Sequence, residues 1–448
     1  MDERRLYKMV LVMLLSLAVF IPLAAMARDA VPVSAAAVPA ARIDTGDTAW
    51  ILVSTALVML MTPGLAMFYG GMVRRKNVLG TIMHSFIAIA LVSLQWILCG
   101  YSLSFGPDVK GLIGSFSWVG LNGVGLTPNA DYAPTIPHLL FMAYQMMFAV
   151  ITPALISGAV AERMKFSAFL IFTLVWTTIV YDPVAHWVWG TGGWLKNLGV
   201  LDFAGGIVVH ATSGFSALAA ALYIGKRKGF LHEHMPPHNL PMTVLGAGLL
   251  WFGWFGFNAG SALSSGTLAT MAFLTTHIAA CSATITWVVV EWLHRGKPTM
   301  FGAATGSIAG LATITPAAGF VGPFSALCIG IAAGIVCYIA LNAKTKFGYD
   351  DSLDAFGVHG VGGTLGTLMA GLFASLAINA AGANGAFFGN IKQFFIQAGA
   401  VGLVALYSFV VSFVMLKVLD TTIGLRIDAE HETEGLDISQ HGEAGYAL

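Results

Sequence analysis

The sequence predicts an all-α protein that crosses a membrane many times. Composition is the first reason: of 448 residues, 57% are hydrophobic and only 10% are charged, with a mean hydropathy of +0.79. Soluble domains contain about 25% charged residues. The other two reasons are the length of the apolar runs and the placement of the positive charges. The formal net charge is zero, which gives no reason to expect binding to nucleic acid.

Apolar runs long enough to cross a bilayer occur eleven times along the chain. Ten of these helices can form a five-plus-five inverted repeat, an arrangement typical of transporters. The glycine pairs Gly70-Gly71, Gly205-Gly206 and Gly362-Gly363 predict close helix crossings. The expected spans are 48–73, 79–105, 136–160, 166–190, 203–224, 241–262, 267–293, 300–316, 320–343, 357–378 and 390–418, of which 300–316 is short.

Positive residues fall unevenly on the loops between these spans. One alternating set of loops carries twelve Lys and Arg residues, and the other set carries three. By the positive-inside rule the first set is cytoplasmic, so the mature N-terminus lies outside and the C-terminus inside. The twelve are Arg74, Arg75, Lys76, Arg163, Lys165, Lys226, Arg227, Lys228, Arg295, Lys297, Lys344 and Lys346, and the three are Lys110, Lys196 and Lys392.

The two ends of the chain differ from the apolar middle. Residues 1–27 have the basic start, apolar core and small-residue cleavage motif of a signal peptide, with an uncleaved anchor as the alternative. Residues 28–45 are expected to be a lead-in on the outer face, and 46–418 the transmembrane domain. Residues 419–448 form a polar, acidic cytoplasmic tail that docks on its own protein, binds a partner or is disordered.

Two histidines lie in matching Gly-rich settings of the fifth and tenth spans. His210 follows Asp202-Phe-Ala-Gly-Gly, and His359 lies in Asp354-Ala-Phe-Gly-Val-His. Ionisable residues at membrane depth usually face a pathway or the bundle interior. Two neutral imidazoles can share one hydrogen bond and leave their outer nitrogens for a substrate. The alternatives are a purely structural hydrogen bond between helices and ligation of a haem.

Asp202 and a set of aromatic residues are the other candidates. Asp202 stands just before the fifth span, where its carboxylate can cap backbone N–H groups or attract a cation directly; capping is favoured. An aromatic face attracts a small cation, and a serine oxygen can accept a hydrogen bond from it. Each aromatic can instead pack in the core or at the membrane interface. The candidates are Tyr144, Phe148, Trp176, Phe257 and Ser261.

The sequence gives no reason to expect a cofactor or a metal. Its four cysteines are scattered through apolar spans, as packing residues are. His232, His234 and His238 share one loop, but no cysteine or carboxylate cluster accompanies them, and a solvated loop is the favoured interpretation.

Several long motifs, in order, resemble the ammonium transporter (Amt) family, relatives of the Rh proteins. The resemblance extends from about residue 46 to the C-terminus. The motifs are Phe-Tyr-Gly-Gly-Met at 68–72, Ala-Glu-Arg-Met-Lys-Phe-Ser at 161–167, Ala-His-Trp-Val-Trp-Gly at 185–190, Asp202–His210, Pro-His-Asn-Leu-Pro at 237–241, Gly253–Ser261 and Asp354–Gly360.

The resemblance implies a homotrimer with one pore in each subunit and assigns a role to each candidate. Tyr144 stands where many members have phenylalanine, so its hydroxyl is expected to join the site or to narrow it. The end of the tail, 434–446, resembles the segment that meets a PII signal protein in bacterial members. The implied roles are recruitment of ammonium for Phe148, Trp176 and Ser261, a stacked gate for Phe148 and Phe257, the pore for His210 and His359, and support of the recruitment site for Asp202.

We therefore expect ammonium transport across the inner (plasma) membrane, without enzymatic activity. Ammonium would be recruited and deprotonated, and ammonia would pass the histidines, because a bare ion faces a desolvation cost that a neutral molecule avoids. The residues allow the proton either to follow through the histidine pair or to return outside. The alternatives are a sensor that acts through its tail, a neutral-gas channel of the Rh kind, and a membrane redox enzyme.

Overall fold

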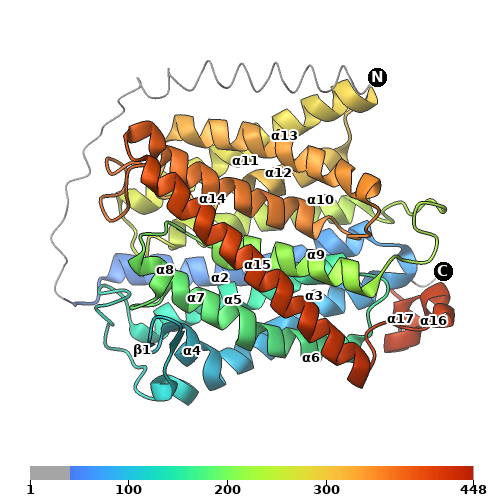
Figure 1. Ribbon diagram of the computed structural model, residues 1–448, viewed down its shortest axis with the longest axis horizontal. Helices are drawn as coiled ribbons and strands as arrows, with labels where there is room; N and C mark the ends of the chain where they lie inside the picture. Colours follow the sequence, from blue (N-terminus) through green and yellow to red (C-terminus); the bar gives the residue numbers. More distant parts are fainter. Residues whose placement is uncertain (1–40, 447–448) are drawn as a thin grey trace.

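The computed structural model describes residues 41–446 as a bundle of long helices connected at its two ends (Figure 1). One end carries β1 (Asp108–Val109), β2 (Ile113–Gly114) and α8 (Trp194–Asn197), and we call it the loop end. The opposite end carries α16 (Ala429–Glu434) and α17 (Leu436–His441), and we call it the tail end. The expected signal peptide at 1–27, and most of the expected lead-in, lie outside the described residues.

Within residues 41–446, ten helical segments are long and apolar enough to cross a membrane, each overlapping an expected span. Several of them consist of consecutive helices with a widened turn between. The segments are α2 (Thr45–Met72); η1 (Arg75–Asn77), α3 (Val78–Gln95), η2 (Trp96–Gly100) and α4 (Tyr101–Phe105); α5 (His138–Val160); α6 (Phe166–Trp176), η4 (Thr177–Tyr181), α7 (Asp182–Trp189) and α8; η5 (Gly206–Ala211) and α9 (Thr212–Ile224); α10 (Leu240–Trp254) and η6 (Phe255–Ala259); α11 (Thr267–Arg295); α13 (Pro323–Phe347); η7 (Phe356–Gly360) and α14 (Val361–Phe373); and α15 (Ile391–Thr422).

The expected span at 300–316 is a helix, α12 (Met300–Ile314), of only 15 residues. That length falls short of the roughly 17 residues that a span needs, so the count of eleven stays a prediction. The last of the ten long segments, α15, continues to Thr422, whereas the sequence predicted its end at 418. The remaining short helices, η3 (Phe116–Leu121) and η8 (Ala386–Phe388), lie in connections.

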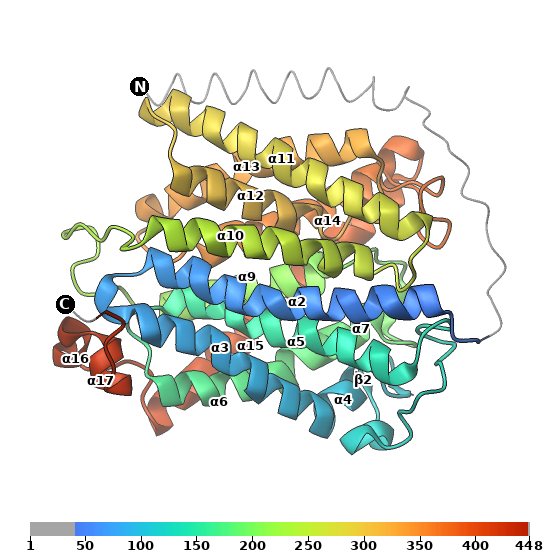
Figure 2. The same cartoon turned by 180° about the vertical axis from the view of Figure 1, so that it is seen from behind.

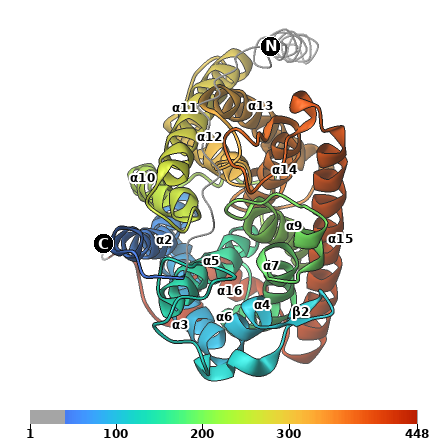
Figure 3. The same ribbon diagram turned by 90° about the vertical axis from the view of Figure 1, so that its left-hand side faces the viewer.

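The two halves of the chain occupy two halves of the bundle. Helices α2 to α9 form one half and α10 to α14 the other, while α15 runs across both (Figures 1 and 3). Seen from behind, α2 lies between α3 and α10 (Figure 2). The contact of α2 with α10 therefore joins the two halves along one side.

Glycines let the helices that carry the two histidines approach closely. A methyl group at Gly214 of α9 would lie 2.1 Å from the backbone nitrogen of Gly360 in η7. A methyl group at Gly363 would lie 2.7 Å from Cβ of His210, and one at Gly71 would lie 2.4 Å from Oγ1 of Thr243. Backbones pack this closely in membranes only where side chains are absent or small.

The tail docks on the tail end of its own protein. The Leu436 N–H donates to Oδ1 of Asn77 at 2.8 Å, and Oδ1 of Asp437 accepts from the Gly80 N–H at 2.9 Å. The Lys228 N–H donates to Oε1 of Glu432 at 2.6 Å. Of the three behaviours expected for this segment, the structure shows the first.

Buried ion pairs connect the loops beneath the tail. The Glu162 carboxylate lies 3.0 Å from guanidinium nitrogens of both Arg74 and Arg227, and Arg227 also binds Asp350 at 2.9 Å. Burial alone would raise the pKa of Glu162, but Arg227 and Arg74 outweigh it and hold that pKa below its ordinary value. The pKa of Asp350 is lowered in the same way, against its burial, by Arg227 and Arg163.

The glycine crossing predicts one stability effect. Gly214→Ala forces its methyl group against the backbone of Gly360, so we expect a lower melting temperature in detergent, equivalent to about 1–3 kcal/mol. Gly399→Ala is the matched control, since a methyl group there meets no atom within 4 Å. Equal melting temperatures for the two variants would contradict the close crossing.

The ion pairs predict a pH effect. Because the folded pKa of Glu162 lies below its unfolded pKa, its contribution to stability is complete above the unfolded value, about 4.3, and is lost as pH falls through the folded value. The melting temperature should therefore fall less between pH 7 and pH 3.5 in Glu162→Gln than in the wild type. Glu430 is an exposed glutamate of the tail, so Glu430→Gln should show the same fall in melting temperature as the wild type. An identical fall in all three proteins would refute the contribution assigned to the Glu162 ion pairs.

Candidate functional site

Two cavities lie in line inside the bundle, separated by a pair of phenylalanine rings. The cavity toward the loop end is the wider of the two, and the one toward the tail end is narrow, with space for about one water-sized molecule. The loop-end cavity is lined by Asp131, Tyr132, Phe141, Gln145, Phe148, Trp189, Lys196, Phe203, Ser261 and Leu263. The inner cavity is lined by Met61, Leu65, Phe68, Ile151, Leu155, Val209, His210, Leu250, Trp254, Phe257, Ile308 and His359.

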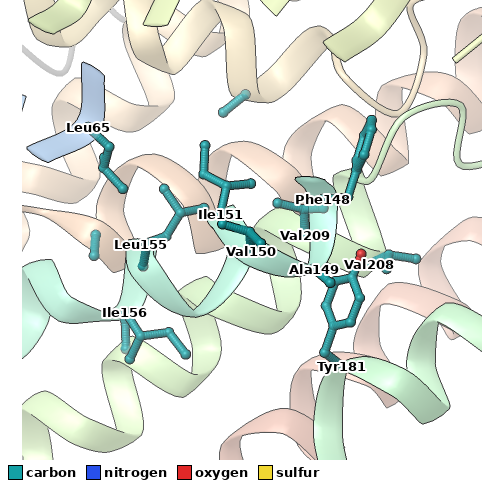
Figure 4. Close-up of a cluster of buried hydrophobic side chains, with 14 of the residues drawn as sticks. Leu65, Phe148, Ala149, Val150, Ile151, Leu155, Ile156, Tyr181, Val208 and Val209 are labelled. Atoms are coloured by element: carbon teal, nitrogen blue, oxygen red, sulfur yellow. The ribbon is translucent and has the colours of Figure 1, made fainter. Parts of the chain in front are cut away.

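Phe148 of α5 and Phe257 of η6 form the separation. Their ring centroids lie 4.2 Å apart at 29°, a stacked arrangement, and both side chains are buried. Phe148 faces the loop-end cavity and Phe257 the inner one. Figure 4 shows Phe148, Ile151 and Leu155 following one another along α5. This spacing puts them on one helical face, so α5 supplies both the barrier and part of the apolar wall beyond it.

The two histidines meet in the inner cavity. Nδ1 of His359 lies 3.2 Å from Nδ1 of His210, and the rings are stacked 5.2 Å apart at 17°. This distance fits one shared hydrogen bond and leaves no space for an iron porphyrin between the rings. Nε2 of His210 is buried and has no hydrogen-bond partner within residues 41–446. It is therefore available to a molecule in the cavity.

Both histidines lie on widened π-helical turns, η5 and η7. Such turns inside α-helices occur frequently at functional sites. The ring of His210 also stacks beside Trp254 at 5.5 Å, so apolar surface covers one face of the pair. Apart from the imidazoles, the residues that line the inner cavity are apolar.

Asp202 fixes the start of the turn that carries His210. Its Oδ1 accepts from the N–H groups of Gly205 at 2.9 Å and Gly206 at 2.6 Å, and its Oδ2 from Ile207 at 2.8 Å and Val208 at 3.0 Å. Gly205 has a φ of +113°, which favours glycine. This is the capping geometry that the sequence favoured over direct binding of a cation.

Asp351 plays the corresponding part at the tail end, before the turn that carries His359. Its carboxylate accepts from the N–H groups of Ala355 at 3.1 Å and Phe356 at 2.8 Å. Asp354 instead pairs with Lys344. The two histidine-bearing turns are thus capped from opposite ends of the molecule.

Tyr144 does not face either cavity. Its hydroxyl lies 2.9 Å from the carbonyl oxygens of both Gly256 and Phe257 and 3.3 Å from Oγ of Ser261. The residue is fully buried. The Tyr144 hydroxyl was expected to join the site or to narrow it. It does not line the loop-end cavity, and instead it holds the backbone that carries Phe257.

Trp176 lies away from Phe148 and Ser261, which corrects its expected place in the recruitment site. Its Nε1 donates to Oγ of Ser216 at 2.9 Å and Oγ of Ser412 at 3.1 Å, between α6, α9 and α15. Trp189 lines the loop-end cavity instead, with its ring 6.0 Å from that of Phe148. The motif at 185–190 contains Trp189 and was the sequence signal that could have identified it.

The remaining histidines and the cysteines form no further site. Across residues 41–446, no group of three or more His, Cys, Asp or Glu residues is arranged to hold a metal ion. All four cysteines are free. In the loop at 232–238, His238 bonds the carbonyl of Val73 at 3.0 Å and the hydroxyl of Tyr446 at 2.9 Å, so it helps to hold the tail.

The cap at Asp202 can be tested by a change that keeps its shape. Each carboxylate oxygen of Asp202 accepts hydrogen bonds from two N–H groups. In Asp202→Asn, one of these oxygens is replaced by an NH₂ group, which cannot accept, so two of the four hydrogen bonds are lost. Since hydrogen bonds to charged groups contribute about 1.5–3 kcal/mol each, we expect a loss of roughly 2–4 kcal/mol, seen as a lower melting temperature. Asp47→Asn is the control, because its Oδ1 can still accept from the Ser265 N–H at 2.8 Å. A melting temperature of Asp202→Asn equal to that of the control would argue against the cap.

Comparison with known proteins identifies relatives over most of the chain. The sequence profile of the Ammonium Transporter Family matches residues 49–446. An ammonium transporter of Bacillus subtilis is 53% identical over 402 residues, which are 90% of this chain and 98% of the relative. Ammonium transporter Amt1 of Archaeoglobus fulgidus is 49% identical over 401 residues, covering 90% and 99% of the two chains.

Solved structures have the same fold. The crystal structure of Saccharomyces cerevisiae Mep2 matches with a TM-score of 0.81 at 36% identity, over 87% of this chain and 88% of that one. A structure described as a sensor Amt protein matches with a TM-score of 0.81 at 31% identity, over 88% and 98%. These matches confirm the resemblance that the motifs indicated. The chain therefore belongs to the ammonium transporter family.

Proposed function

We propose that the protein transports ammonium, taking the cation at the loop-end cavity and passing ammonia through the inner one. The observation that carries this proposal is the sequence of three features along one line: a cavity with aromatic and hydroxyl groups, the stacked Phe148 and Phe257, and an apolar cavity whose polar lining is His210 and His359. The relatives named as ammonium transporters support it.

Recruitment takes place beside Phe148, Trp189 and Ser261. The rings of Phe148 and Trp189 lie edge to face at 89° and both line the cavity, so a small cation beside the pair is close to two aromatic rings. The Ser261 hydroxyl donates to the carbonyl of Phe257 at 2.8 Å, which leaves its oxygen free to accept from ammonium. Trp189 takes the place that the sequence assigned to Trp176.

Selectivity arises at and beyond the phenylalanine pair. Ammonium and potassium have similar size and charge, but ammonium alone can release a proton and continue as a neutral molecule. The apolar inner cavity penalises any bare ion through lost hydration. Neutral imidazoles then supply the polar contacts: the pair shares a hydrogen bond through Nδ1, and Nε2 of His210 meets ammonia.

The assembly and its setting follow from the family resemblance and the charges. We propose a homotrimer of eleven-helix subunits in the inner (plasma) membrane, each with its own pore and a five-plus-five inverted repeat. The loop end faces outward and the tail end the cytoplasm. In support, the basic loops at 74–76, 163–165 and 226–228 all contact one another or the tail. A PII-type signal protein is the proposed partner at that face.

An ammonium sensor that acts through the tail is the second candidate. It is favoured by the likeness to the sensor Amt structure and by the docking of α16 and α17 on the loops that lead to the pore helices. Ammonium-dependent hydrogen exchange of 429–441 in a protein that carries no ammonium current would favour this function over transport.

The transport proposal is tested on proteoliposomes that contain only this protein, by solid-supported membrane electrophysiology. We expect a transient current on addition of ammonium and none with potassium. In His210→Asp, a fixed carboxylate replaces an imidazole of the inner cavity and can stabilise a bare cation, so we expect a potassium current comparable to the ammonium current.

His232→Asp, in the exposed tail-end loop, is the matched control and should keep wild-type selectivity. Loss of both currents in His210→Asp would count against the filter mechanism. If no current is seen but internal pH still reports ammonium entry, the protein conducts neutral ammonia and moves no net charge.

A further inference from the structure

A lysine side chain reaches the mouth of the cavity that is proposed to recruit ammonium. Lys196 lies on α8 at the loop end and lines the same cavity as Phe148, Trp189 and Ser261. A fixed positive charge at the entrance of a cation pathway opposes the entry of cations. Its position therefore calls for a function that the recruitment site alone does not explain.

The surroundings of the Lys196 ammonium group are those of a cation site. Nζ donates to the carbonyl oxygen of Trp189 at 3.0 Å and lies 5.8 Å from the centroid of the Tyr132 ring. Asp131 lines the same cavity and interacts electrostatically with Lys196. A carbonyl, an aromatic face and a carboxylate are the three kinds of group that hold an ammonium ion.

The groups that hold Nζ are themselves fixed. The Tyr132 hydroxyl donates to the carbonyl of Phe105 at 2.7 Å and accepts from the Thr191 N–H at 3.0 Å, and its ring stacks on Phe141 at 5.1 Å. The carbonyl that accepts from Nζ belongs to Trp189, whose ring faces Phe148. The aromatic and carbonyl parts of the subsite are thus preformed, and the subsite lies within the recruitment cavity itself.

A primary ammonium group and the ammonium ion share charge and hydrogen-bond donors. We propose that Tyr132, the Trp189 carbonyl and Asp131 form an outer subsite for ammonium and methylammonium, which Lys196 occupies as a tethered competitor. A tether of one side chain gives a competitor an effective concentration of at least millimolar order. Lys196 is exposed, so its head can leave the subsite for solvent when ammonium enters. This inference rests on the proposed transport function.

Removal of the charge should strengthen binding of the substrate. In Lys196→Gln the subsite is free of its competitor and the entrance loses one positive charge, so we expect the KM for ammonium and methylammonium to fall by about three- to tenfold at low ionic strength. KM is obtained from peak transient currents on proteoliposomes, with the maximal current as the internal reference. Lys196→Arg keeps the charge and should keep a KM within twofold of wild type.

Lys392→Gln is the matched control, since Lys392 lies at the start of α15 near the loop end but outside this cavity. A KM in Lys196→Gln within twofold of wild type would overturn the inference, and so would an equal fall in Lys196→Arg or in Lys392→Gln. A wild-type ammonium current with unchanged KM in Lys196→Gln refutes the subsite alone. If the wild type shows neither a current nor ammonium entry detectable by internal pH, the transport proposal and this inference are refuted together.

Discussion

The cost of placing an unpaired charge or a bare backbone polar group in an apolar interior governs this structure. An ion transferred whole into such a medium loses hydration worth of the order of 20 kcal/mol in the idealised case. Phe148 and Phe257 close the path to water, and beyond them the lining is apolar except for His210 and His359. A pathway built in this way favours a neutral passenger, and a hydrogen-bonding one, because the imidazoles offer it partners.

The same cost applies to the helix that begins inside the protein. The first N–H groups of a helix have no partner within it, and those of η5 lie deep in the bundle. Asp202 satisfies three of them and the preceding Gly205 N–H with two oxygens, and Asp351 satisfies the first N–H of η7 and that of Ala355 just before it. These caps hold the two widened turns from opposite ends, and the glycine crossing then brings the imidazoles within hydrogen-bonding distance.

Long apolar runs and the cap at Asp202 were predictable because each depends on local composition or on spacing along one helix, and the histidine pair because two matching Gly-rich motifs occupy corresponding spans. The stacked phenylalanines required the family motifs, since nothing local relates residue 148 to residue 257. The resemblance implied Trp176, but Trp189, which was not among the candidates from the sequence, lines the cavity: both lie in one membrane segment, and Trp189 is 13 residues closer to its loop end. The hydrogen bonds of Tyr144 and the contact of Lys196 with the Tyr132 ring join segments distant in sequence and were not foreseeable.

The charged residues at the two ends of the bundle differ in their surroundings. At the tail end, the buried carboxylates of Glu162 and Asp350 form ion pairs with the half-buried Arg74 and Arg227. At the loop end, Lys196 and Asp131 remain at the edge of an open cavity, where substrate and solvent reach them. Charged groups therefore line the cavity at the loop end, whereas the cavity beyond the phenylalanines has only two imidazoles in an otherwise apolar lining.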